Sequence, residues 1–143
     1  MDFRIVSVPY VGPRVHADIP ERGVKVNEWG IHTRYVEHDS GGYWDLCDFP
    51  LREAGEAEVA SWPMPDPDLY DYGSVRGQCR RWDAYGICLA CYGDLINGNG
   101  FLRGMEQTLV DLLTDEPAGL LLADRRFGIQ EEVARRTLRA AEG

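Results

Sequence analysis

The chain has little positive charge and no long apolar run. Only one of its 15 basic residues is a lysine, Lys25, and 24 acidic residues give a net charge of −9. A protein that binds nucleic acid needs a basic face to neutralise phosphates, so this balance argues against nucleic acid as the main partner. No stretch approaches the ~18 consecutive apolar residues of a membrane-spanning helix, and residues 1–15 lack the apolar core of a secretion signal. We expect a cytoplasmic protein that does not bind membranes.

Cysteines are few, at positions 47, 79, 88 and 91, and a cytoplasmic location keeps them reduced. Cys88 and Cys91 have the two-residue spacing of a zinc knuckle or a redox pair. Residues i and i+3 of a strand point to opposite faces, however, and no second pair follows. We therefore interpret the cysteines as buried structural residues and predict no metal site and no cofactor. A metal or redox role for Cys88 and Cys91 is the alternative.

The first third of the chain predicts antiparallel strands. Short alternating segments separated by turn signals indicate a hairpin region over about 3–47, with its clearest turn at Asp39-Ser40-Gly41-Gly42. His38 and Asp39 at this turn could serve proton transfer, although a surface histidine in a turn is the simpler interpretation. Trp44 follows the turn and lines a ligand pocket if the hairpin folds over one. Packing is the alternative for Trp44.

The remaining two thirds predict helices around one strand. Asp66 or Asp68, at the end of a proline-rich connector, caps the first helix. The strand that follows is apolar on both faces, which is typical of a parallel strand covered by helices on each side. A Gly/Asn/Asp-rich loop separates it from the next helix. The expected elements are a helix over about 68–82, a strand over about 85–92, a loop over 93–100 and helices near 101–114 and 117–141.

The loop after the predicted strand 85–92 is the candidate ligand site. A loop that leaves the carboxyl end of a parallel strand and enters a helix collects backbone N–H groups and ligands. Asp94, Asn97 and Arg103 flank this loop and can converge on a carboxylate-bearing ligand. In the competing interpretation, Asp94 and Asn97 make turn hydrogen bonds, and Arg103 pairs with Glu106 or Asp94.

The last predicted helix carries apolar residues on two faces. Such a wide apolar arc needs neighbours on two sides, so we expect self-association or a partner protein. One face holds Leu120, Ala123, Phe127, Ala134, Leu138 and Ala141, and the other holds Leu122, Ile129 and Val133.

Five segments occur together in an order that resembles a known family. They are Asn27-Glu28-Trp29-Gly30, Gly41-Gly42-Tyr43-Trp44, Asp48-Phe49-Pro50-Leu51, Trp62-Pro63-Met64-Pro65-Asp66-Pro67 and Leu102-Arg103-Gly104-Met105-Glu106. Together they resemble the amino-terminal part of the uroporphyrinogen decarboxylase superfamily, which also contains cobalamin-linked methyltransferases.

The resemblance implies an α/β fold, an incomplete (β/α)8 TIM barrel with an antiparallel β-hairpin inserted near its amino terminus. Residues 1–143 would form a single domain, with the hairpin region over 1–62 and the barrel part over 63–143. The implied activity is decarboxylation of uroporphyrinogen in porphyrin biosynthesis, a lyase reaction, or corrinoid-linked methyl transfer. The implied ligand is an anionic tetrapyrrole or corrinoid-linked molecule, and Asp94, Asn97, Arg103 and Trp44 are the predicted contacts.

Three departures from the family predict an inactive fragment. The Arg-rich amino-terminal segment is missing, the position of a substrate-contacting Tyr falls near Gly100, and the methyltransferases' zinc ligands belong to a later half. No catalytic residue is therefore assigned. The alternatives are a stand-alone ligand-binding module and a non-catalytic protein that associates through an exposed barrel edge. The expected partner is a second copy of this chain or a protein that supplies the missing half-barrel.

Overall fold

The computed structural model describes residues 2–89 and 94–142 of a mixed α/β chain, which divides into two compact units. The first unit consists of Met1–Pro13, Pro65–Asp94 and Phe127–Gly143, and the second of Arg14–Met64 and Leu95–Arg126. Each unit therefore combines segments that are far apart in the sequence. Among the described residues, no helix is long and apolar enough to cross a membrane.

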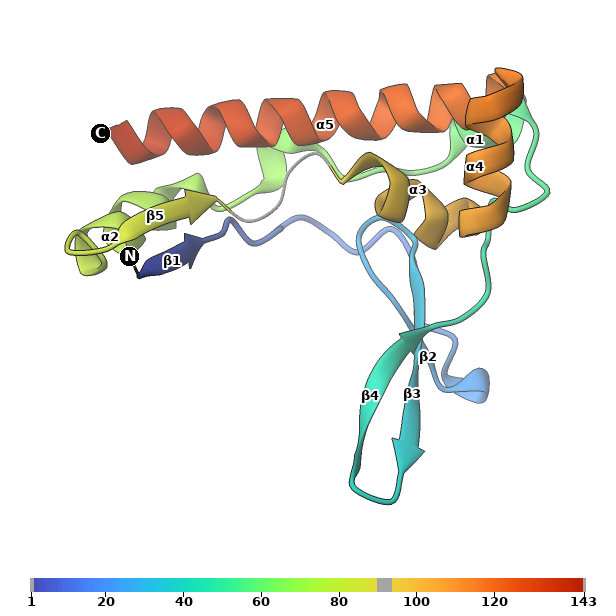
Figure 1. Ribbon diagram of the computed structural model, residues 1–143, viewed down its shortest axis with the longest axis horizontal. Coiled ribbons are helices and arrows are strands. Elements are labelled where there is room, and N and C mark those ends of the chain that lie inside the picture. Colours follow the sequence, from blue (N-terminus) through green and yellow to red (C-terminus); the bar gives the residue numbers. More distant parts are fainter. Residues whose placement is uncertain (1, 90–93, 143) are drawn as a thin grey trace. The chain divides into compact units, whose positions relative to one another are not determined.

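A three-stranded antiparallel sheet lies in the second unit. Its strands are β2 (Val24–Val26), β3 (His32–His38) and β4 (Gly41–Leu46), in the order β2-β3-β4. The tight turn between β3 and β4 places Tyr35 opposite Trp44, and the pair extends as a long hairpin (Figure 1). The sequence prediction of antiparallel strands is confirmed for this part of the hairpin region.

Helices complete the second unit. These are α1 (Glu56–Ser61), α3 (Leu95–Arg103), α4 (Met105–Thr114) and the beginning of α5 (Pro117–Glu142). Their apolar side chains bury a core with the chain around β2 and β3, because each helix has one face that must leave water. The buried members are Ile31, Leu51, Ala54, Val59, Leu102, Ala118 and Leu122.

The predicted loop over 93–100 is wrong from Leu95 onward. Helix α3 already begins at Leu95 and includes Asn97-Gly98-Asn99-Gly100. Two glycines within a helix each cost roughly 1 kcal/mol relative to alanine, so local propensity favours a loop here. Tertiary packing favours the glycines, because a Cβ at Gly98 would overlap the guanidinium of Arg126.

In the first unit, a two-stranded parallel sheet pairs β1 (Phe3–Val6) with β5 (Gly86–Leu89). Helix α2 (Val75–Arg81) and the later part of α5 belong to the same unit. Val6 and Val8 share a buried core with Val75 of α2 and Val133 of α5.

The incomplete (β/α)8 barrel is wrong. A barrel strand must have a hydrogen-bonded neighbour on each side in one closing sheet. In the described residues, β1 and β5 pair with each other, whereas β2, β3 and β4 form a separate antiparallel sheet. The predicted hairpin region over about 3–47 is also too wide, because β1 at residues 3–6 belongs to the parallel pair rather than to the antiparallel sheet.

The predicted burial of the strand over about 85–92 is wrong as well. None of the four residues of β5 is fully buried, and Ile87 is 38% exposed. Cys88 is exposed, while Cys47 and Cys79 are half-buried, so the cysteines are not the buried structural residues we expected. Cys91 and the end of the predicted strand lie outside the described residues.

Helix α5 confirms the predicted helix near 117–141. One of its two apolar faces is covered, since Leu122 and Val133 are buried. Phe127 and Leu138 of the other face are 48% and 53% exposed. The predicted helix over 68–82 is wrong in its first part, because two short 3₁₀ turns precede α2. Asp66, one of the two residues expected to cap that helix, caps the 3₁₀ turn Pro67–Leu69 instead.

Candidate functional site

Arg103 ends α3 and is almost fully buried. Its Nη1 donates to the carbonyls of Leu51 and Ala54, each at 2.8 Å. Its Nε donates to Asp111 Oδ2 on α4, and its Nη2 donates to Asp111 Oδ1 at 3.3 Å. The carboxylate partner is thus Asp111, and the exposed Glu106 of the competing interpretation is not the residue that neutralises Arg103. This geometry makes Arg103 a clamp between the 51–54 turn and the two helices.

Asn99 of α3 and Arg126 of α5 form a second buried polar contact. Arg126 Nη1 donates to Asn99 Oδ1 at 2.9 Å, and both residues are about 3% exposed. The guanidinium of Arg126 also lies 5.0 Å from the centroid of the Trp29 ring, within the range of a cation–π contact. Sequence reasoning missed this pair, although glycines on both sides of Asn99 signal that another group approaches the helix closely.

The other predicted ligand contacts lie in different settings. Asn97 is exposed on α3, whereas Arg103 on the same helix is buried. Asp94 is half-buried and belongs to the first unit, immediately before α3 in sequence. Asn97 is therefore accessible to a ligand and Arg103 is not, and Asp94 is assigned to a different unit from both.

Trp44 lies on β4 with 45% of its surface exposed. Lys25 Nζ of β2 sits 4.1 Å from the centroid of the indole ring, and the Tyr35 ring meets it edge-on at 5.6 Å. The nearest neighbours of Trp44 are thus residues of its own sheet, and its ring remains open to a partner.

A cluster that the sequence did not reveal surrounds Asp48. Its Oδ1 accepts from Arg22 Nη2 at 2.8 Å, and its Oδ2 lies 3.2 Å from His32 Nδ1. The hydrogen bond from Arg22, followed by the one from His32, holds the pKa of Asp48 below its usual value. Burial instead raises the pKa of the neighbouring Cys47 thiol, which keeps it protonated and poorly nucleophilic.

In this cluster the Asp48 carboxylate orients the His32 ring. A carboxylate on Nδ1 fixes the imidazole ring and its tautomer, an arrangement that proton transfer also uses. Asp48 itself has a φ of +55°, which Asp and Asn tolerate better than most residues. Among the described residues, no three His, Cys, Asp or Glu side chains are placed to hold a metal ion.

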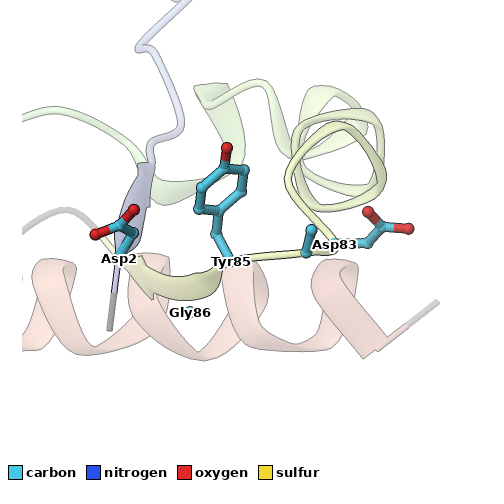
Figure 2. Close-up of a pocket in the computed structure, with 5 residues that line it drawn as sticks. Asp2, Asp83, Tyr85 and Gly86 are labelled. Carbon is cyan, nitrogen blue, oxygen red and sulfur yellow. The ribbon is translucent and has the colours of Figure 1, made fainter.

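An open cavity of about 460 Å³ lies in the first unit beside the start of β5. Figure 2 shows the carboxylates of Asp2 and Asp83 on opposite sides of the Tyr85 ring. Ala84 and Gly86 complete the lining. Two carboxylates favour a cationic group over an anionic one, and none of the predicted ligand contacts lines this cavity.

In comparisons with protein families, with curated proteins and with solved structures, no match to this chain is found.

Proposed function

We propose that this chain is a cytoplasmic, uroporphyrinogen decarboxylase-like protein that binds an anionic tetrapyrrole or corrinoid-linked molecule. By itself it neither decarboxylates a porphyrinogen nor transfers a methyl group. The observation that carries this proposal is that four of the five segments that resemble the family meet in pairs, residues 48–51 with 102–106 and residues 27–30 with Trp62. Residues that recur in one order in a family are expected to build one common framework.

The first contact joins two of these segments through their backbones. Leu51 N donates to the carbonyl of Leu102 at 2.9 Å, and Arg103 returns a hydrogen bond to the carbonyl of Leu51. Both leucines are also part of the buried core. The segments around Leu51 and Leu102 are therefore held together by hydrogen bonds and by apolar packing.

The second contact joins the Asn27 turn to Trp62. Asn27 Oδ1 accepts from the backbone N–H groups of Trp29 and Ile31 at 3.0 and 2.9 Å. Trp62 Nε1 donates to the Trp29 carbonyl at 3.0 Å. Gly30 has a φ of +82°, and a Cβ there would overlap the Trp62 ring. Asparagine, glycine and tryptophan are thus each required at their positions by this one turn.

These contacts give the residues of the resembling segments a structural role. We therefore expect the ligand to contact exposed residues near them. Asn97, exposed on α3, and Asp94, just before it, remain the predicted ligand contacts. Arg103 supports α3 through its bonds to Leu51, Ala54 and Asp111. Trp44 remains a predicted contact because its ring is partly exposed.

Binding is tested with uroporphyrin, the fluorescent oxidised form of the substrate. We expect saturable quenching with the wild-type chain and weaker affinity for Asn97→Ala, which removes an amide donor to the ligand's carboxylates. Glu106→Ala is the matched control, since Glu106 is an exposed residue of α4 outside the predicted contacts. Absence of saturable binding to the folded wild-type chain overturns the proposal.

Turnover is tested separately. The purified chain is incubated with uroporphyrinogen under reducing conditions, and the loss of carboxylates is followed by mass spectrometry. We expect none, because binding without oriented catalytic groups gives little rate. Turnover that disappears in Asp94→Ala would show that the chain is an enzyme in its own right.

A second candidate function is a self-associating module, and the exposed apolar side of α4 favours it. Several apolar side chains of this helix face outward: Met105, Leu109 and Leu112 are 39%, 45% and 38% exposed, and Leu113 is 85% exposed. The side that faces the core holds Thr108 and Asp111 instead. Exposed apolar surface of this kind promotes association between proteins.

Sedimentation equilibrium of the wild-type chain tests self-association. We expect dimers or larger species on the order of tens of micromolar, where exposed apolar surface causes association. A well-folded monomer throughout that range contradicts the second candidate and leaves the ligand proposal untouched.

A further inference from the structure

We propose that β4 is an interface strand through which two copies of this chain pair edge to edge, forming one six-stranded antiparallel sheet. This proposal rests on the self-association suggested above and names its surface and partner. It does not depend on the ligand. It follows from the hydrogen-bond directions of β4, the composition of its open edge and the charges beside it.

The register of the hairpin decides which backbone groups of β4 point outward. Cys47 N donates to the His32 carbonyl at 3.1 Å, so Cys47 and the residues two and four positions before it direct their backbone groups towards β3. In an antiparallel ladder the intervening residues point the opposite way. Gly42, Trp44 and Leu46 therefore present their N–H and C=O groups at the open edge of the sheet, because β4 is its outermost strand.

The edge lacks most of the features that block strand addition. Natural edge strands are protected by lysine, proline, bulges or a covering element. The sequence of β4, Gly-Gly-Tyr-Trp-Asp-Leu, contains neither lysine nor proline, and its first five residues are exposed. One protecting contact is present: Asp45 Oδ1 accepts from Leu46 N at 2.9 Å. The N–H groups of Gly42 and Trp44 are the donors that remain for an incoming strand.

Symmetry and charge select a second copy in one register. A two-fold axis through Trp44 lets each Trp44 exchange both backbone hydrogen bonds with Trp44 of the second copy. Each Gly42 N–H then donates to the Leu46 carbonyl of the other copy. This register keeps all paired residues within Gly41–Leu46 and places Asp45 beside Tyr43 of the second copy. A shift of the axis to Gly42 would place Asp39 opposite Asp45, two like charges in direct opposition.

The side chains suit this pairing on both faces of the sheet. Trp44 and Tyr35 extend one face, and Tyr43 and Val36 the other, and all four are at least 36% exposed. When two edges pair, these rings pack against the same rings of the second copy and are shielded from water. Aromatic cross-strand pairs stabilise antiparallel sheets. The net charge of −9 opposes association at long range, so added salt should strengthen the dimer.

The test compares two substitutions at the same position. Trp44→Pro removes the outward N–H without breaking a hydrogen bond to β3, since the Trp44 backbone faces the open edge. Trp44→Thr removes the same ring but keeps the N–H and a strand-forming residue. In sedimentation equilibrium, we expect the dimerisation affinity to fall at least tenfold for Trp44→Pro and by a smaller factor for Trp44→Thr.

We expect a third variant to strengthen the dimer. Asp45→Ala frees the Leu46 N–H, which then donates to the Gly42 carbonyl of the second copy, and the two added hydrogen bonds should tighten the dimer roughly tenfold. Glu37→Ala on β3 removes the same charge without freeing a backbone donor, and it should have a much smaller effect. Circular dichroism confirms that each variant keeps its fold.

The outcomes separate the two proposals. If the wild-type chain dimerises and all four variants match it, self-association stands through another surface and the β4 interface is overturned. If Trp44→Thr weakens the dimer as much as Trp44→Pro, the ring and not the strand edge carries association, and the proposal fails. A monomeric wild-type chain overturns the second candidate function, and it overturns the β4 interface as well if Asp45→Ala also stays monomeric.

Discussion

Arg103 and Asp111 form a buried ion pair in which the guanidinium makes a two-point contact with the carboxylate. Their side chains are only 5% and 2% exposed. The remaining Nη1 donor of Arg103 reaches the Leu51 and Ala54 carbonyls, so the pair is fully embedded in hydrogen bonds. Such a pair is costly to break from one side, because the surviving charge stays buried without its partner.

We predict that Asp111→Ala destabilises the chain by about 3–5 kcal/mol, the typical effect of leaving one member of a buried pair uncompensated. Urea denaturation followed by circular dichroism measures the effect. Glu106→Ala, an exposed position on the same helix, should stay within about 0.5 kcal/mol of the wild type. Equal effects of the two substitutions would mean that Asp111 is accessible to solvent.

Two glycines of α5 should respond to alanine in opposite directions. A Cβ at Gly119 would overlap the side chain of Asp111, whereas nothing lies within 4 Å of a Cβ at Gly128. We expect Gly119→Ala to destabilise by about 1–3 kcal/mol through overpacking. Gly128→Ala should stabilise by roughly 0.5–1 kcal/mol, since it removes the entropic cost of a helical glycine. Thermal melts of both variants check the signs, and a loss of stability in Gly128→Ala would contradict the open environment of that position.

The contact of Asp48 with Arg22 and His32 should make a pH-dependent contribution to stability. The pKa of Asp48 is lower in the folded chain than its usual value. Its stabilisation is therefore fully present above about pH 4, near the unfolded pKa, and is lost as the pH falls through the lower folded pKa. Because Asp48 is about one-third exposed, solvent screening keeps the contribution below about 1 kcal/mol.

Asp48→Asn tests this dependence, because asparagine tolerates the positive φ of this position. Its stability should fall below that of the wild type at pH 7, and the gap should close in acid. Asp39→Asn, at the exposed turn between β3 and β4, measures the loss of charge alone. A gap that stays constant down to acid pH would assign the effect to something other than the ion pair.

Trp62→Phe should cost about 1 kcal/mol, the net value of a typical hydrogen bond, because phenylalanine cannot donate to the Trp29 carbonyl. The ring itself stacks on His16 at 5.0 Å, and phenylalanine preserves most of that contact. Trp44→Phe, on the exposed hairpin, is the control and should change the stability less. Urea midpoints compare the two. A larger effect at Trp44 would mean that the hairpin, rather than the Asn27 turn, limits the stability of the second unit.

The sequence by itself determined the elements that are specified locally. Alternation and a tight turn predicted the β3–β4 hairpin, and apolar periodicity over more than six turns predicted α5. The side chain of Asp66 acts as a cap as the sequence indicated, although it caps the 3₁₀ turn Pro67–Leu69 rather than a helix over 68–82. In these cases nearest-neighbour geometry and hydrogen bonds within a few residues are sufficient.

Tertiary structure decided what depends on residues far apart in the chain. It made a helix of Asn97-Gly98-Asn99-Gly100, because Arg126 needs the space that glycine leaves. It paired β1 with β5 across more than eighty residues, and it turned Asp111 of α4 towards the core while apolar side chains of the same helix stayed exposed. For α3 and α4 the reason is the same. A buried charge must find its partner wherever the chain places it, and that requirement outweighs the propensities of roughly 1 kcal/mol that a local pattern records.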